Sequence, residues 1–141
     1  MKDNEDMDLA SGIAAFEAKH FSQAFKLLSP LADAGNAEAL YRLAIMYQNG
    51  LGVVRNELKA FGSMKRAAEA GHALAQHGLG FMYMDGDCID RDGARAVKWF
   101  TRAAEQGLAG SKATLAMMYQ EGTLVEKDEA LAAKLLKEAG F

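Results

Sequence analysis

The stretch AEALYRLAIMYQN, residues 37–49, decides the fold, because the chain presents related versions of it three times. ALAQHGLGFMYMD follows 36 residues later at 73–85, and AGSKATLAMMYQE follows after the same interval at 109–121. Six positions keep one residue type at this period: Ala37, Ala73 and Ala109; Leu43, Leu79 and Leu115; Tyr47, Tyr83 and Tyr119; Gly50, Gly86 and Gly122; Ala60, Ala96 and Ala132; Ala67, Ala103 and Ala139. A fixed period of this length indicates a repeat protein.

Each repeat is predicted to contain two helices. In the first copy, Leu43 and Tyr47 share one face of a helix over 37–49. Gly50 ends this helix, because glycine adopts the left-handed conformation without steric cost. A second helix is expected over 57–70. One such pair cannot bury its own apolar face, so neighbouring pairs must stack to complete the core.

Polar residues mark the start of every second helix. Asn56, Asp92 and Asp128 occupy this place in the three copies. Their side chains can accept hydrogen bonds from the free N–H groups of the first helical turn, worth about 1 kcal/mol each. We therefore expect three capped helices at equivalent positions.

The residues before the first repeat are predicted to form a divergent helix pair. Ala24, Phe25 and Ala32 lie one period before residues of the second helix of copy one. Pro30 is expected to bend this helix, because proline removes an N–H bond and clashes with the preceding turn. The chain is then divided as follows: a flexible acidic N-terminus at 1–7, a capping helix pair at 8–35, and repeats at 36–71, 72–107 and 108–141, which form one continuous repeat domain. The predicted fold class is an all-α right-handed superhelix, or solenoid, of antiparallel helix pairs with about eight helices.

The pattern resembles that of the Sel-one-like repeat family, a relative of the tetratricopeptide repeat. The family motif runs roughly A-x-A-x-x-x-L-G-x-x-Y-x-x-G-x-G-V, then D-x-x-x-A, then A-A-x-x-G, and residues 37–139 follow it well. The second loop glycine, Gly52, is replaced by Cys88 and Leu124 in the later copies, so those two loops are expected to differ in shape. The resemblance implies an α/α superhelix that acts as a non-catalytic adaptor in protein complexes.

Composition argues against several classes of partner. The chain has 16 Lys and Arg against 19 Asp and Glu, a formal net charge of −3, and the basic residues are scattered. Nucleic-acid binding and membrane binding are therefore not expected. No apolar run is long enough to cross a bilayer, and the first residues lack the features of a signal peptide. With one cysteine in the chain, we expect a cytoplasmic protein.

Candidate chemical groups favour structural interpretations. His72 and His77 are five residues apart, which does not place them on one helical face for metal binding. His72 is instead expected in a turn, and His77 on an exposed helix face. Acidic neighbours disfavour a reactive thiolate at Cys88. The acidic loop that begins at Asp85 fails the EF-hand spacing, because Ile89 stands where an oxygen ligand is needed. We expect no metal, no cofactor and no catalytic residue.

The first helices are expected to line a concave groove that binds a peptide or protein surface. Ile45, Phe81 and Met117 stand at the middle of the three helices and would form an apolar stripe in that groove. Alternatively, they pack between adjacent first helices, and the sequence leaves both interpretations open. The full set of candidate groove residues is Glu38, Tyr41, Arg42, Ile45, Asn49, Leu74, His77, Phe81, Met84, Asp85, Thr114, Met117, Gln120 and Glu121.

The sequence is compatible with two further functions. The last helix ends near Phe141 without a polar helix after it, so Leu131, Leu135, Leu136 and Phe141 are candidates for self-association, either as a homodimer or end to end. A structural subunit that acts through such contacts is the first alternative to the adaptor. A hydrolase is the second alternative, and it would need a histidine or cysteine beside a carboxylate in a pocket.

Overall fold

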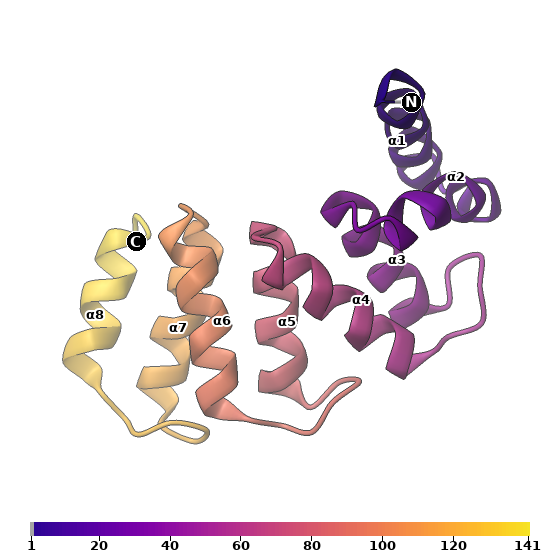
Figure 1. Cartoon of the computed structure of the whole chain (residues 1–141). Helices are drawn as coiled ribbons and strands as arrows, with labels where there is room; N and C mark the ends of the chain where they lie inside the picture. The colour runs from indigo at the N-terminus through magenta and orange to yellow at the C-terminus, as the bar shows by residue number, and fades with distance from the viewer. Residues whose placement is uncertain (1) are drawn as a thin grey trace. The chain divides into compact units, whose positions relative to one another are not determined.

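The computed structural model describes residues 2–141, with side chains described from Asn4 onward. Over these residues it contains eight helices and no strand (Figure 1). The helices are α1 (Lys2–Glu17), α2 (Phe21–Asp33), α3 (Ala37–Asn49), α4 (Glu57–Glu69), α5 (Ala73–Asp85), α6 (Gly93–Glu105), α7 (Ala109–Glu121) and α8 (Glu129–Glu138). The predicted all-α repeat fold is confirmed.

The chain divides into two compact units. Unit 1 spans Met1–Ala75 and unit 2 spans Gln76–Phe141, so the boundary falls inside α5. In unit 1, α1 packs on α2, α2 on α3, and α3 on α4. In unit 2, α6 packs on α7 and α7 on α8. The boundary does not coincide with the repeat limits expected from the sequence, which stay a prediction.

Local sequence signals set the helix ends. The side chains of Asn56, Asp92 and Asp128 each accept a hydrogen bond from the backbone N–H three residues later, as predicted. Gly50 and Gly122 adopt the left-handed conformation at the C-caps of α3 and α7, with φ of 66° and 64°. These devices satisfy backbone groups that a helix leaves free at its ends.

Small residues form the centre of each unit. In unit 1, Ala39, Ala60 and Ala67 are completely buried and let α3 and α4 approach closely. In unit 2, Ala96 and Ala103 are equally buried on α6, and the buried ring of Phe100 on the same helix packs against Phe81 of α5. Apolar burial of this kind supplies most of the driving force for folding.

One expectation about the N-terminus stays open, and one about the loops needs correction. α1 begins at Lys2, and only Met1 lies outside the described residues, while the flexibility expected for residues 1–7 stays a prediction. The loop at Cys88 was expected to differ from that at Gly52, yet Cys88 has a φ of +67° and Gly52 one of +70°. The loop at Leu124 does lack this positive φ.

Pro30 lies inside α2, three residues before its last residue, Asp33, and four before its C-cap, Ala34. The N–H of Ala34 donates to the Pro30 carbonyl at 3.1 Å, so the helix continues beyond the proline. The predicted bend stays a prediction. Within the residues that the structure describes, no helix combines the length and the apolar character that crossing a membrane requires.

Candidate interaction surface

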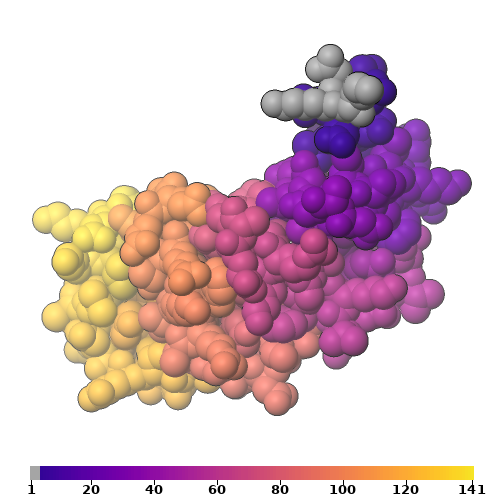
Figure 2. Space-filling model, in the orientation of Figure 1, coloured from indigo at the N-terminus to yellow at the C-terminus, as the bar shows by residue number. Residues whose placement is uncertain are grey.

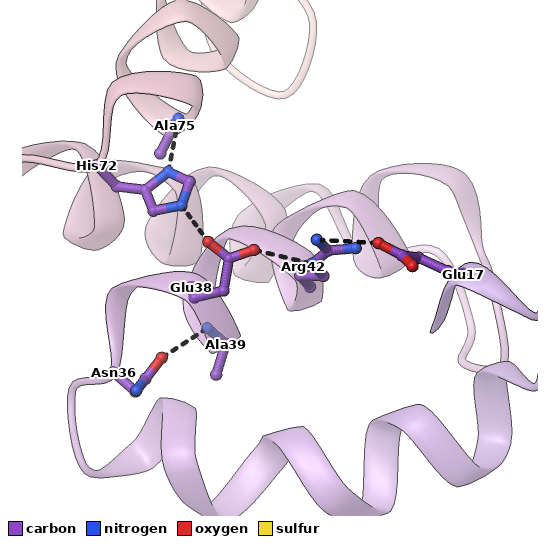
Figure 3. A network of polar contacts seen from close by, with 7 residues as sticks. All are labelled: Glu17, Asn36, Glu38, Ala39, Arg42, His72 and Ala75. Carbon is purple, nitrogen blue, oxygen red and sulfur yellow. Dashed lines mark hydrogen bonds and ion pairs between the residues drawn. The ribbon is translucent and has the colours of Figure 1, made fainter. Parts of the chain in front are cut away.

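A chain of polar contacts in unit 1 connects α1, α3 and the start of α5 (Figure 3). Arg42 donates from Nε to Glu38 at 3.0 Å, and its other end lies 3.8 Å from Glu17. Glu38 also contacts Nε2 of His72 at 2.6 Å. The guanidinium of Arg42 lies 5.0 Å from the ring centre of Phe16, so this arginine holds α1 against α3 by charge and by stacking.

Both ring nitrogens of His72 are engaged. Nδ1 accepts the backbone N–H of Ala75 at 3.1 Å, so it carries no proton, and Nε2 must donate to Glu38. The ring also stacks on Tyr41 at 4.8 Å between centres. A histidine beside a carboxylate was the sign that would favour a hydrolase. Here the pair caps α5, and neither nitrogen is free to take a proton from a substrate.

The network also affects acid–base behaviour. Burial raises the pKa of Glu38, but hydrogen bonds from His72 and Arg42 outweigh that effect, so its pKa lies below the ordinary value. Burial raises the pKa of Tyr41. Three of the candidate groove residues, Glu38, Tyr41 and Arg42, are therefore brought together, but by contacts within the unit.

An aromatic cluster in unit 2 surrounds His77. Its ring packs edge-on against Phe81 at 4.9 Å and Phe100 at 5.4 Å. Nδ1 lies 2.7 Å from the hydroxyl oxygen of Ser111, which is fully buried. Burial lowers the pKa of His77. The expectation that His77 stands on an exposed helix face is thus wrong, since it is half-buried between α5, α6 and α7.

A hollow of about 390 Å³ opens in unit 2 beside the C-terminal ends of α5 and α7. It brings together four candidate groove residues from two helices: Met84 and Asp85 of α5, and Met117 and Glu121 of α7. Arg91, Met118, Thr123 and Leu124 complete its lining. Met117 has 51% of its surface exposed. We call this site the α5–α7 hollow; three methionines and two carboxylates are among the residues that line it.

The remaining candidate groove residues lie apart from these clusters. Thr114 is buried, and its hydroxyl donates to the carbonyl of Gly110, so it offers no surface to a partner. The side-chain amide of Asn49 donates to the carbonyl of Ile45. Leu74 and Gln120 are exposed.

The candidate self-association residues lie at the end of unit 2, where Figure 2 shows the yellow surface of α8 uncovered on the visible side. Leu131 and Leu135 line a second hollow of about 410 Å³, over Leu115 and Tyr119 of α7. Leu136 is partly exposed and Phe141 is 81% exposed. We call this site the α6–α8 hollow.

The groups with possible chemistry stay dispersed. No cluster of three His, Cys, Asp or Glu side chains close enough to hold a metal ion occurs in the part of the chain that the structure describes. The thiol of Cys88 lies 3.6 Å from a carboxylate oxygen of Asp87. Asp92 of the same acidic loop is occupied as the cap of α6.

Sequence reasoning missed several of these residues. His72 was assigned to a turn, although it links Glu38 to the start of α5. The two residues are 34 positions apart, which no spacing rule for a single helix relates. Arg91, Thr123 and Leu124 were missed because they lie on loops, whereas the groove was derived from helix positions alone.

Comparisons with known proteins agree with this architecture. The family model described as Sel1 repeat matches residues 37–72, 73–108 and 113–140. Among curated proteins, none matches the sequence.

Two solved structures are similar to the chain. The first is c5321, a protective antigen of uropathogenic Escherichia coli strains that displays an SLR fold, with 33% identity and a TM-score of 0.89 over 96% of this chain. The second is a Sel1 repeat protein from Oxalobacter formigenes, with 32% identity and a TM-score of 0.85 over 94% of this chain. The chain spans only 30% of the first protein and 53% of the second. With three matched repeats and helix pairs that follow their period, the chain belongs to the Sel1 repeat family.

Proposed function

We propose that the chain is a non-catalytic adaptor that binds a protein partner through the faces of its first helices, and that the α5–α7 hollow holds the partner's anchor. Sel1 repeats generally mediate contacts between proteins, and proteins built from them are typically non-catalytic scaffolds. The proposal includes the concave groove and the cytoplasmic location expected from the sequence, for which the single cysteine is the support.

The observation that carries this proposal is the composition of the α5–α7 hollow. Met84, Met117 and Met118 supply flexible, polarisable side chains, which adapt to different apolar anchors. Asp85 and Glu121 outnumber Arg91 among the lining residues, so the hollow favours a basic group. The expected ligand is therefore a peptide segment with an apolar side chain flanked by lysine or arginine.

Two peptides test the proposal: Arg-Leu-Phe-Arg and Glu-Leu-Phe-Glu, each with blocked ends, titrated into the isotope-labelled chain while backbone amide shifts are followed. We expect the basic peptide to move the amides of residues 84–85 and 117–124. Met117→Lys should weaken this binding at least about tenfold by charge repulsion. Leu58→Lys is the matched control, since Leu58 is 82% exposed in unit 1. Equal binding of both peptides, or unchanged binding by Met117→Lys, would refute the proposal.

Self-association is a second candidate, which the α6–α8 hollow favours. Leu131 and Leu135 line this hollow, and Phe141 is exposed beside the end of α8. Exposed apolar surface of this kind commonly serves as an interface between copies. We expect a concentration-dependent increase in mass by sedimentation, abolished by Leu135→Glu and retained in Leu58→Glu. A single monomeric species at all concentrations would eliminate this candidate.

A further inference from the structure

A third opening lies in unit 1. The proposed groove follows the first helices of the pairs, whereas this opening lies between second helices. It has a volume of about 410 Å³ and lies between the second helices α2 and α4, over α3. Its lining includes Phe25, Leu40, Tyr47, Lys59, Gly62 and Arg66. Phe25 and Tyr47 meet edge-on at 5.9 Å between ring centres and form an apolar floor. We call this opening the α2–α4 groove.

The α2–α4 groove occupies a defined place in the repeat. Leu43 and Tyr47 in its floor correspond to Leu115 and Tyr119 in the α6–α8 hollow, 72 residues later. One position of the second helix differs between the copies. Gly62 stands where the other copies have Lys98 and Lys134. The first copy therefore lacks the long side chain that the other two place at this position.

Two residues of the groove are unfavourable for the stability of the free chain. Gly62 lies in the interior of α4, where glycine is less favourable than alanine, and nothing lies within 4 Å of a Cβ built there. Ser29 also lines the groove, and its hydroxyl is buried without a hydrogen-bond partner among the described residues. Residues that break local rules at one place are typical of functional sites.

The rim of this groove is positively charged. Lys59 and Arg66 line it together with a single acid, Asp33. Among the described residues neither cation forms an ion pair; the contact of Lys59 is with the ring of Tyr47, at 5.5 Å. The chain as a whole has a net charge of −3, so the two unpaired cations beside the apolar floor give this groove a local charge opposite to that of the chain.

We propose that the α2–α4 groove is a second docking site, which takes an acidic peptide segment with an aromatic or leucine anchor. The anchor would lie on Phe25 and Tyr47, entering beside Gly62. The flanking carboxylates would pair with Lys59 and Arg66. Charge complementarity selects this class of partner, because the lining of the α5–α7 hollow has the opposite balance of charge.

The same pair of blocked peptides tests this proposal independently of the proposed function. We expect Glu-Leu-Phe-Glu to move the amides of residues 25–33, 43–47 and 59–66, and binding should weaken as salt is added. Gly62→Leu should reduce the affinity at least about tenfold by filling the entrance. Gly62→Ala is the matched control, since a methyl group meets open space there and should leave binding unchanged.

Charge reversal provides the second arm. In the Arg66→Glu variant, Glu-Leu-Phe-Glu should no longer shift these amides, and Arg-Leu-Phe-Arg should shift them instead. A partly unfolded variant would not show this exchange of specificity. The proposal is overturned if neither peptide moves these amides, if both do so equally in the unsubstituted chain, or if Gly62→Leu binds like Gly62→Ala. It is also overturned if the shifts depend on protein concentration alone, which would assign the groove to a second copy.

Discussion

Two glycines inside helices differ in what surrounds them, and this difference sets the sign of a substitution. Nothing approaches a Cβ built at Gly62, whereas one built at Gly80 would lie 2.8 Å from the ring of Phe100, which is fully buried. Gly62→Ala should raise the free energy of unfolding by about 0.5–1 kcal/mol. Gly80→Ala should lower it by about 1–3 kcal/mol through overpacking. Urea denaturation of both variants measures these changes, and effects of the same sign would contradict the packing described here.

Cys88 pays a conformational cost that glycine would avoid. Its φ of +67° lies in the left-handed region, which costs a residue with a Cβ about 1–2 kcal/mol. Cys88→Gly should therefore stabilise the chain by about 0.5–1 kcal/mol, after the greater freedom of glycine in the unfolded state is subtracted. The control is Cys88→Ala, which removes the thiol but keeps the strained backbone, and should give no gain. Denaturation under reducing conditions measures the free energy of unfolding of both variants. Equal values for Cys88→Gly and Cys88→Ala would show that backbone strain at this position does not lower stability.

At the scale of helices, His77 makes the packing of α5, α6 and α7 sensitive to pH. Burial lowers its pKa in the folded state, so the unfolded chain takes up a proton first as the pH falls. This contribution to stability is complete above the ordinary histidine pKa of about 6.5 and is lost as the pH falls toward the folded pKa. Thermal melts between neutral and mildly acidic pH should show a decline that His77→Gln reduces.

His20 provides the control for this pH dependence. It lies exposed in the turn before α2 and forms no side-chain cap. His20→Gln should therefore leave the decline of melting temperature with acid unchanged. If His20→Gln and His77→Gln flatten the pH profile equally, burial between the three helices is not the cause.

The helices could be predicted from sequence because their signals are local. Asn56 and Gly50 act on backbone groups a few residues away, so a reader of the sequence sees both the signal and its target. The bounds 37–49 were obtained in this way. The sites could not be predicted so well, because Met84 and Met117 come to line one hollow, and His72 meets Glu38, only after helices from different repeats have packed. Which side of a helix faces its neighbour depends on rotation about the helix axis, and a single period does not specify it.

At the scale of the whole molecule, the contacts that stabilise the chain fall into two units. In repeat proteins each repeat contacts only its neighbours, so a local change is felt mainly nearby. The network of Arg42 lies wholly in unit 1, where it holds α1 through Phe16 and Glu17. This network is a suitable place to measure how far a disturbance spreads.

Arg42→Met removes the ion pairs and the cation–π contact while keeping a long apolar side chain. The loss should be about 1 kcal/mol, because Glu17 is largely exposed and such pairs contribute little individually. Hydrogen exchange should then quicken about fivefold in α1, with little change in α6, α7 and α8. Arg42→Lys keeps the charge but loses the planar guanidinium group. Its exchange rate in α1 should lie between those of the unsubstituted chain and Arg42→Met. Equal quickening in both units would show that the chain unfolds as one cooperative body, and the two clusters of contacts would then have no separate stability.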